Sequence, residues 1–152
     1  MGKALLLIAA SLMVLSCQPK LDNRMINKEY QFKEGQVWEY ETRIGEESSK
    51  LTILKVEEYP RGQVVVHIAI DNVNIKSPTS EDSIVTSIEH LPFDLEALEK
   101  SVTKKITDNQ PIPDFKDGYE VWKLFFDEGD AGVFSTSVKE AVAYTEETME
   151  QE

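Results

Sequence analysis

The sequence has little cysteine, proline and glycine, and each shortage limits what the protein can be. Cys17 is the only cysteine among 152 residues, which excludes an internal disulfide and a cysteine metal cluster. Its 6 prolines and 7 glycines form no low-complexity block, internal repeat or glycine-rich phosphate-binding loop. With 41% hydrophobic and 29% charged residues, the chain has a globular composition and the length of one domain.

Positive charge is also scarce. The chain has 16 lysines and arginines against 28 aspartates and glutamates, which gives a formal net charge of -12. An electrostatic field of this sign repels nucleic acid and bare anionic lipid surfaces. We therefore expect no nucleic-acid partner, and the charge favours either solubility or binding to a cationic partner.

The longest apolar run lies at the N-terminus, after a single positive charge. Lys3 precedes an uncharged segment, and its apolar part from Ala4 to Leu15 has 12 residues, about 18 Å as a helix. A bilayer core needs about 20 apolar residues, so this run is too short to span it. A short basic stretch before such a run is typical of a secretory signal peptide. The alternative is a helix buried on all sides at the start of a globular domain.

The residues at the end of the apolar run indicate which type of signal peptide this is. Residues 13–17 read MVLSC, which resembles the lipobox of bacterial lipoproteins: apolar residues, one small residue and then a cysteine. The resemblance implies cleavage between Ser16 and Cys17, with a diacylglyceryl group on the Cys17 sulfur and acylation of its new amino group. It also implies a lipid anchor in a bacterial membrane, on the extracytoplasmic side (the periplasm in a diderm). The alternative for Cys17 is a free thiol behind an ordinary cleavage site.

These predictions divide the chain into three parts. Residues 1–16 are the predicted signal peptide, residues 17–29 the lipidated cysteine and a polar tether, and residues 30–152 a single domain. Removal of residues 1–16 takes away Lys3 and changes the net charge from -12 to -13. Each buried methylene contributes about 0.8 kcal/mol, so two or three acyl chains are needed for a durable anchor.

Alternating hydrophobicity predicts strands in the first half of the domain. Residues 37–44 alternate and place Trp38, Tyr40 and Ile44 on one face of a strand. Further strands are predicted over residues 51–59 and 64–75, with a short one at 85–89. Because the connections are short, we expect an antiparallel meander of three to four strands.

Helical spacing takes over in the second half. Asp94 is the predicted N-cap of a helix that runs to about Ile106. Tyr119, Trp122 and Phe126 then share one side of a second helix, with Gly129 as its C-terminal stop.

A last helix completes the predicted domain. Residues 131–135 are predicted as a short strand, and Ser137 to Glu140 has the pattern of a capping box that opens the last helix. The predicted class is therefore α+β, with two or three helices packed on one face of the meander.

Few residues carry recognisable chemistry. His67 falls in the third predicted strand and His90 just before the first predicted helix, and no nucleophile motif accompanies either. Both are interpreted as strand-surface or loop histidines rather than catalytic bases. The acidic residues Asp127, Glu128 and Asp130 lack the alternating ligands and the sixth-position glycine of an EF-hand. We predict no metal and no cofactor.

Adjacent carboxylates are common, and a glycosidase needs two of them across a cleft, one with a raised pKa. The pairs are Glu46–Glu47, Glu57–Glu58, Glu81–Asp82 and Glu146–Glu147. Pairs of this kind are usually solvated charge.

The aromatic residues allow two readings. They either line a ligand groove or form the core where helices meet the sheet, and the spacing favours the core. They are Trp38, Tyr40, Trp122, Phe125 and Phe126.

Three functions fit the sequence. The first is a membrane-anchored lipoprotein whose non-enzymatic domain binds or assembles at the cell envelope. The second is an inhibitor or immunity protein for a cationic cell-wall hydrolase, which the acidic charge suits. The third is a small hydrolase that uses a pair of carboxylates.

Overall fold

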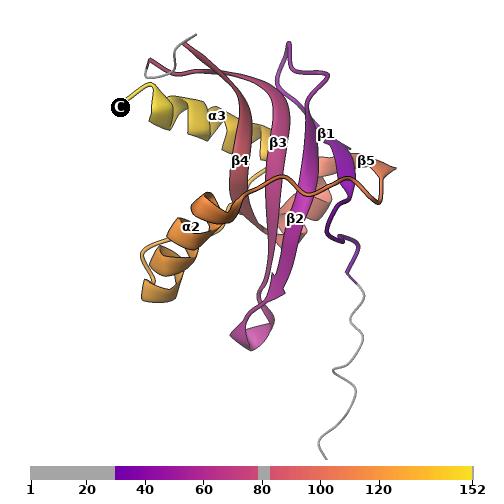
Figure 1. The fold of residues 1–152 in the computed structure, drawn as a ribbon, viewed down its shortest axis with the longest axis vertical. Coiled ribbons are helices and arrows are strands. Elements are labelled where there is room, and N and C mark those ends of the chain that lie inside the picture. Colours follow the sequence, from indigo (N-terminus) through magenta and orange to yellow (C-terminus); the bar gives the residue numbers. More distant parts are fainter. Residues whose placement is uncertain (1–29, 79–82, 152) are drawn as a thin grey trace, which may run out of the picture.

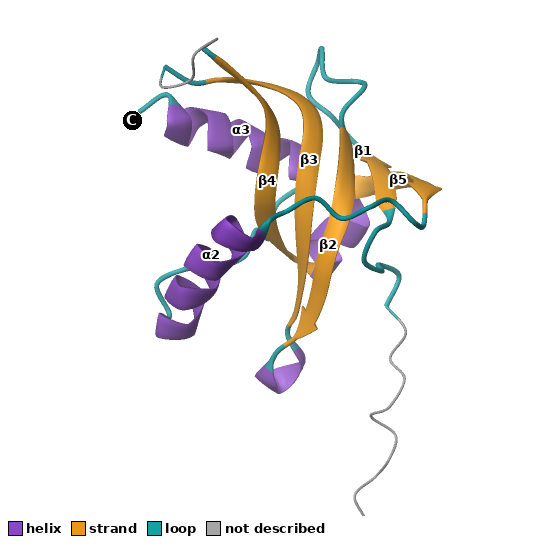
Figure 2. Ribbon diagram, viewed as in Figure 1, coloured by secondary structure: helices purple, strands orange, loops and turns teal. Residues whose placement is uncertain are grey.

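A five-stranded antiparallel sheet forms the centre of the fold (Figures 1 and 2). The computed structural model describes residues 30–78 and 83–151. Its strands are β1 (Val37–Tyr40), β2 (Lys50–Glu58), β3 (Val64–Lys76), β4 (Ile84–Asp94) and β5 (Val102–Thr107). Their order across the sheet is β4-β3-β2-β1-β5, so the first four strands form the predicted meander. The predicted signal peptide, Ser16, Cys17, the tether and the pair Glu81–Asp82 lie outside the described residues.

Helices lie on both faces of this sheet. They are α1 (Leu95–Ser101), α2 (Lys116–Glu128) and α3 (Val138–Met149), with a short 3-10 helix, η2 (Pro60–Gly62). Helices α1 and α3 lie behind the sheet in Figure 1, and α2 lies against the opposite face near β4. The predicted α+β class is confirmed, and α1 and α3 are the two helices that share one face.

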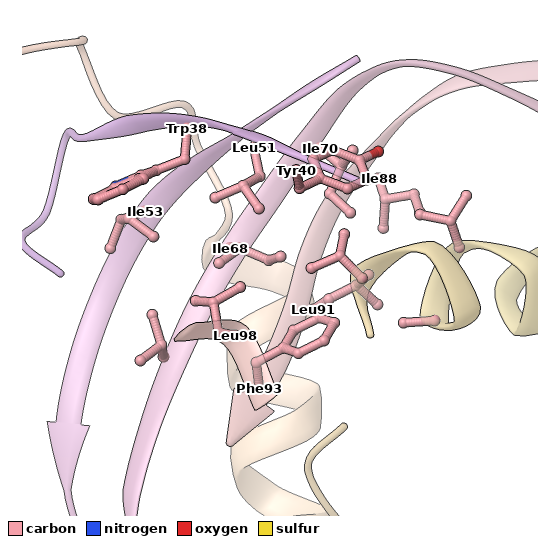
Figure 3. Close-up of a cluster of buried hydrophobic side chains, with 14 of the residues drawn as sticks. Trp38, Tyr40, Leu51, Ile53, Ile68, Ile70, Ile88, Leu91, Phe93 and Leu98 are labelled. Atoms are coloured by element: carbon pink, nitrogen blue, oxygen red, sulfur yellow. The ribbon is translucent and has the colours of Figure 1, made fainter. Parts of the chain in front are cut away.

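Strand β3 is buried on both sides because helices cover both faces. Successive side chains of a strand point to opposite faces, so Val66 and Ile68 point toward α1 and α3, while His67 points toward α2. The main core lies between the sheet and the first pair of helices, where Phe93 and Leu98 are fully buried (Figure 3). The second face is smaller and contains the polar residues described below.

The first strand is shorter than predicted. It ends at Tyr40, and Ile44, predicted to face inward with Trp38, is 100% exposed. Strand β1 pairs with both β2 and β5 and its register with β5 shifts twice. Beyond it the chain turns at Gly45, whose φ of +86° lies in the left-handed region that glycine favours. The inward position predicted for Ile44 is therefore wrong.

The first helix is also shorter than predicted. It begins at the N-cap Asp94, as expected, but ends at Ser101, and residues 102–107 form β5 instead. This segment, VTKKIT, is rich in β-branched residues, which favour strands. It completes the sheet by pairing with β1, where Tyr40 lies opposite Val102. The predicted continuation of the helix to Ile106 is wrong because tertiary pairing decides the structure of this segment.

Two further strands differ from their predictions, β4 and the strand predicted at 131–135. Strand β4 is 11 residues long where a short strand at 85–89 was predicted. The strand predicted at 131–135 is wrong: within the described residues this segment makes a single bridge, between Phe134 and Phe93. The capping box at Ser137 is confirmed, because its hydroxyl accepts from the Glu140 N–H and the Glu140 carboxylate accepts from the Ser137 N–H.

Candidate functional site

One row of aromatic side chains packs helix α2 against the sheet. Phe115, Tyr119, Trp122 and Phe126 recur every three or four residues, which places them on one side of the helix. Trp122 is the buried residue of α2, and its indole N–H donates to a backbone oxygen 2.8 Å away in the following loop. The helix ends at Gly129, whose φ is +85°. The predicted row and the predicted end of this helix are both confirmed.

Two histidines lie beneath this helix and contact each other. His67 of β3 and His90 of β4 occupy neighbouring strands, and Nδ1 of His67 is 2.9 Å from Nε2 of His90. Their rings are stacked, with centroids 5.1 Å apart. His67 is 0% exposed. The interpretation of these residues as strand-surface or loop histidines is therefore wrong: His67 is in the interior, and His90 lies within β4, partly buried.

Glu57 of β2 connects the histidines to helix α2. Its carboxylate accepts from the Lys55 ammonium at 2.9 Å and from the Tyr119 hydroxyl at 3.0 Å. It also accepts from the Tyr59 hydroxyl, and its Oε2 is 3.1 Å from Nε2 of His67. We call these four donors, Glu57 and His90 the Glu57 cluster.

One arrangement of hydrogens satisfies both hydrogen bonds that run from Glu57 through His67 to His90. An ionised carboxylate only accepts, so Nε2 of His67 carries a hydrogen and donates to Glu57. Nδ1 of a neutral His67 is then an acceptor, and Nε2 of His90 donates to it. Protonation of both rings would leave two donors facing each other across 2.9 Å. The geometry therefore disfavours two charged histidines.

The pKa values agree with this assignment. Burial lowers the pKa of His67 to about 4, helped by the charge that His90 would carry, and burial likewise lowers the pKa of His90 to about 4. Burial alone would raise the pKa of Glu57, but the hydrogen bonds from Lys55 and Tyr119 outweigh it and lower that pKa. Both histidines are neutral and Glu57 is ionised at neutral pH.

Helix α2 approaches the histidines closely. The rings of Tyr119 and Trp122 meet the His67 ring nearly edge-on, at centroid distances of 5.1 and 4.8 Å. At Gly118 an added Cβ would lie 3.1 Å from Cβ of His90, which is closer than ordinary van der Waals contact. A glycine at this position lets the helix backbone pass directly over β4.

A hollow opens beside the Glu57 cluster. Its volume is about 450 Å³, and Lys55 and Tyr119 form part of its wall. The rest of the wall includes Ile112 and Phe115 from the chain before α2, and Leu54 of β2. The hollow therefore meets the outer members of the cluster and leaves His67 beneath them.

The Glu57 cluster has little capacity for chemistry. A carboxylate offers about four lone-pair positions, and Glu57 already has four donors. When the Tyr119 hydroxyl donates to Oε1, each oxygen accepts from two donors, and a proton from a substrate or from water would have to displace one of them. The cluster is therefore suited to holding α2 on the sheet.

The sequence contained a signal for this cluster that hydrophobic pattern alone did not reveal. His67 interrupts an otherwise apolar run from Val64 to Ile70. A polar residue in a strand buried on both faces needs a partner. Lys55 and Glu57, two residues apart on β2, share the face on which His67 points. The contribution of Tyr119 depends on how α2 packs.

A second group of carboxylates is also paired rather than solvated. Glu46 and Glu146 both bond to the Arg43 guanidinium. A hydrogen bond from Arg43 lowers the pKa of Glu46, and a backbone N–H of Lys76 lowers that of Glu146. This network fastens the β1–β2 loop to α3. Glu47 and Glu58 are exposed, as the interpretation as solvated charge predicts.

The predicted aromatics divide between core and surface. Trp38, Tyr40 and Trp122 are buried, in agreement with a core role, and Phe126 is partly buried. Phe125 is exposed, so it does not belong to the core. Asp127 and Glu128, in the last turn of α2, and Asp130, just beyond it, are exposed.

Neither a metal centre nor a membrane span is found in the part of the chain that the structure describes. No three histidine, cysteine, aspartate or glutamate side chains there are arranged to hold a metal ion. None of the described helices has both the length and the apolar character to cross a membrane. Comparisons of the chain with protein-family models, with curated proteins and with solved structures found no match.

Proposed function

We propose that the protein is a lipid-anchored extracytoplasmic protein of the bacterial cell envelope, and that its domain acts by binding a protein partner. The observation that supports binding over catalysis is the saturation of Glu57. In the Glu57 cluster, the Glu57 carboxylate accepts from four donors, and the two histidines are hydrogen-bonded to each other. Such a cluster stabilises the fold and leaves function to the surface of the domain.

The carboxylate-dependent hydrolase has less support. Its general acid needs a raised pKa, whereas hydrogen bonds from Lys55 and Tyr119 lower the pKa of Glu57 despite its burial. The test is hydrolysis of peptidoglycan and of chromogenic glycosides by the full chain. Activity that disappears in Glu57→Gln, with the fold intact, would overturn the binding proposal.

The anchoring half of the proposal rests on the lipobox residues, with cleavage between Ser16 and Cys17. We expect Cys17→Ala to accumulate as a precursor that keeps residues 1–16 and incorporates no labelled fatty acid, because the thiol is the acyl acceptor. Intact mass and labelled palmitate incorporation measure both effects. Ser11→Ala, within the apolar run, is the control and should be processed normally. Normal cleavage and membrane retention of Cys17→Ala would contradict the anchor.

A specific observation favours the inhibitor or immunity protein as a second candidate. From Ile106 to Glu152 the chain has three lysines and twelve acidic residues, so most of the negative charge lies on the C-terminal part. Complementary charge speeds association with a basic enzyme. We expect inhibition of a basic cell-wall hydrolase such as lysozyme, with an association rate that falls steeply as salt rises. Undiminished hydrolase activity at micromolar protein would remove this candidate.

A further inference from the structure

Helix α2 exposes an apolar strip on the side that its aromatic row does not use. Val121 and Leu124 are each 59% exposed, and Phe125 is 46% exposed. Their spacing of three and four residues places them next to one another along the helix. We call these three residues the α2 ridge. Contiguous exposed apolar groups with polar neighbours are typical of interaction sites.

Charge is distributed unequally around the α2 ridge. On one side of the α2 ridge, Lys116 pairs with Glu120, and Lys123 pairs with Asp127. Asp117 lies one turn before Val121, and Glu128 lies one turn after Leu124.

The two carboxylates beside the ridge lack such partners. Within the described residues no ion pair includes Asp117 or Glu128. Asp130 follows directly after the helix and adds a third negative charge. The α2 ridge is therefore an apolar surface with uncompensated negative charge at both ends.

We propose that the α2 ridge is the docking surface for a cationic protein partner, which places apolar side chains on Leu124 and Phe125 and basic side chains beside Asp117 and Glu128. The inference rests on the proposed binding function and names the face and the partner chemistry. An amphipathic helix with leucine-like anchors and flanking lysines or arginines has the required pattern. The negative ends of the ridge select for such a partner and against an acidic one.

The same charges disfavour other occupants. A second copy of the chain would bring its own Asp117 and Glu128 against those of the first, and like charges repel. An anionic lipid surface is repelled by the net charge of -12. The apolar segment 4–15 is removed by the proposed cleavage at Cys17. A cationic partner is the occupant for which both the apolar and the charged parts of the surface are complementary.

The test measures binding of three helical probe peptides to the full chain in phosphatidylcholine nanodiscs. The first peptide has leucines on one face and lysines on the other. The second has the same composition with the leucines spread around the helix, and the third has glutamates in place of the lysines. We expect the first to bind at least about tenfold more tightly than either of the others, after subtraction of binding to empty nanodiscs. We also expect its affinity to fall as the salt concentration rises.

Matched variants locate the binding surface. Leu124→Asn should weaken binding of the first peptide about tenfold, because a leucine anchor is lost. Ile44→Asn is the control, because Ile44 is an equally large and fully exposed apolar residue on another part of the surface. Asp117→Asn with Glu128→Gln should weaken binding and reduce its salt dependence. All four substituted residues are exposed, so thermal unfolding should be unchanged.

Several results would overturn the inference. The glutamate peptide could bind as tightly as the lysine peptide, or the first peptide could fail to bind at about 100 µM. Leu124→Asn and Ile44→Asn could weaken binding equally. The chain could also self-associate through a contact that Leu124→Asn abolishes. Each would leave the proposed function standing, since that proposal fails instead through a Glu57-dependent activity or a normally processed Cys17→Ala protein.

Discussion

Lowering the pH from neutrality to about 4 is expected to reduce the free energy of unfolding by on the order of 3 kcal/mol through His67 alone. His67 is fully buried, and its pKa is about 4 in the folded chain because of that burial and of the neighbouring His90. In the unfolded chain both histidines return to an ordinary pKa near 6.5. The unfolded state therefore binds more protons between these two values.

The sign of the effect follows from this difference. The contribution of the neutral histidines is fully present above about pH 6.5 and is lost as the pH falls toward 4. Each histidine contributes a slope of up to about 1.4 kcal/mol per pH unit in this window. Of the groups that face the pair, Glu57 has a lowered pKa and Lys55 a raised one, so both keep their charges in the upper part of this window.

Urea unfolding at several pH values between 7.5 and 4.5 measures this slope. The chain has 2 histidines, and no other side chain has an ordinary pKa between pH 5 and 7.5. Replacement of His67 and His90 together by glutamine should flatten the profile above pH 5, whatever its effect on stability at neutral pH. A flat profile in the unsubstituted chain, or an equal slope in the double variant, would show that the pair is not held neutral.

The fold could be predicted from the sequence wherever local pattern and tertiary environment agree. The hairpin strands, the Asp94 cap and the end of α2 at Gly129 follow from alternation, capping chemistry and a glycine in the left-handed region. Prediction failed at β5, where Val102 continues the helical spacing of Leu95 and Leu98 but pairing with β1 overrides it. It also failed at Ile44, because nothing local marks the two register shifts of β1.

The candidate site was harder to predict because its residues come from four elements. The four elements are β2 with Glu57, β3 with His67, β4 with His90 and α2 with Tyr119. These residues are far apart in the sequence, and only the topology of the fold brings them together. The amphipathic pattern of α2 predicted its buried aromatic row but left open which face of the sheet it covers. Once α2 is known to lie opposite α1 and α3, a polar cluster beneath it follows from the alternation of β2 and β3.

Glu57→Gln is expected to destabilise the domain by about 2 to 3 kcal/mol. The amide removes the charge and replaces one acceptor oxygen with a donor, so it faces the Lys55 ammonium and the His67 N–H without enough acceptors. Glu58→Gln is the matched control, since Glu58 is exposed and its carboxylate accepts from the Tyr30 hydroxyl at 2.8 Å. Its expected effect is within about 0.5 kcal/mol.

Hydrogen exchange then separates the role of the cluster from general loss of stability. Helix α2 buries one residue, Trp122, whereas α3 buries Val138, Ala141 and Val142 in the main core. If the Glu57 cluster holds α2 on the sheet, Glu57→Gln should speed amide exchange throughout α2 while α3 keeps the protection expected from global stability. Lys55→Met should have the same local signature, because it removes the ammonium that donates to both Glu57 and Tyr119. Uniform loss of protection in α2 and α3 would mean that the cluster stabilises the sheet as a whole and that α2 does not depend on it.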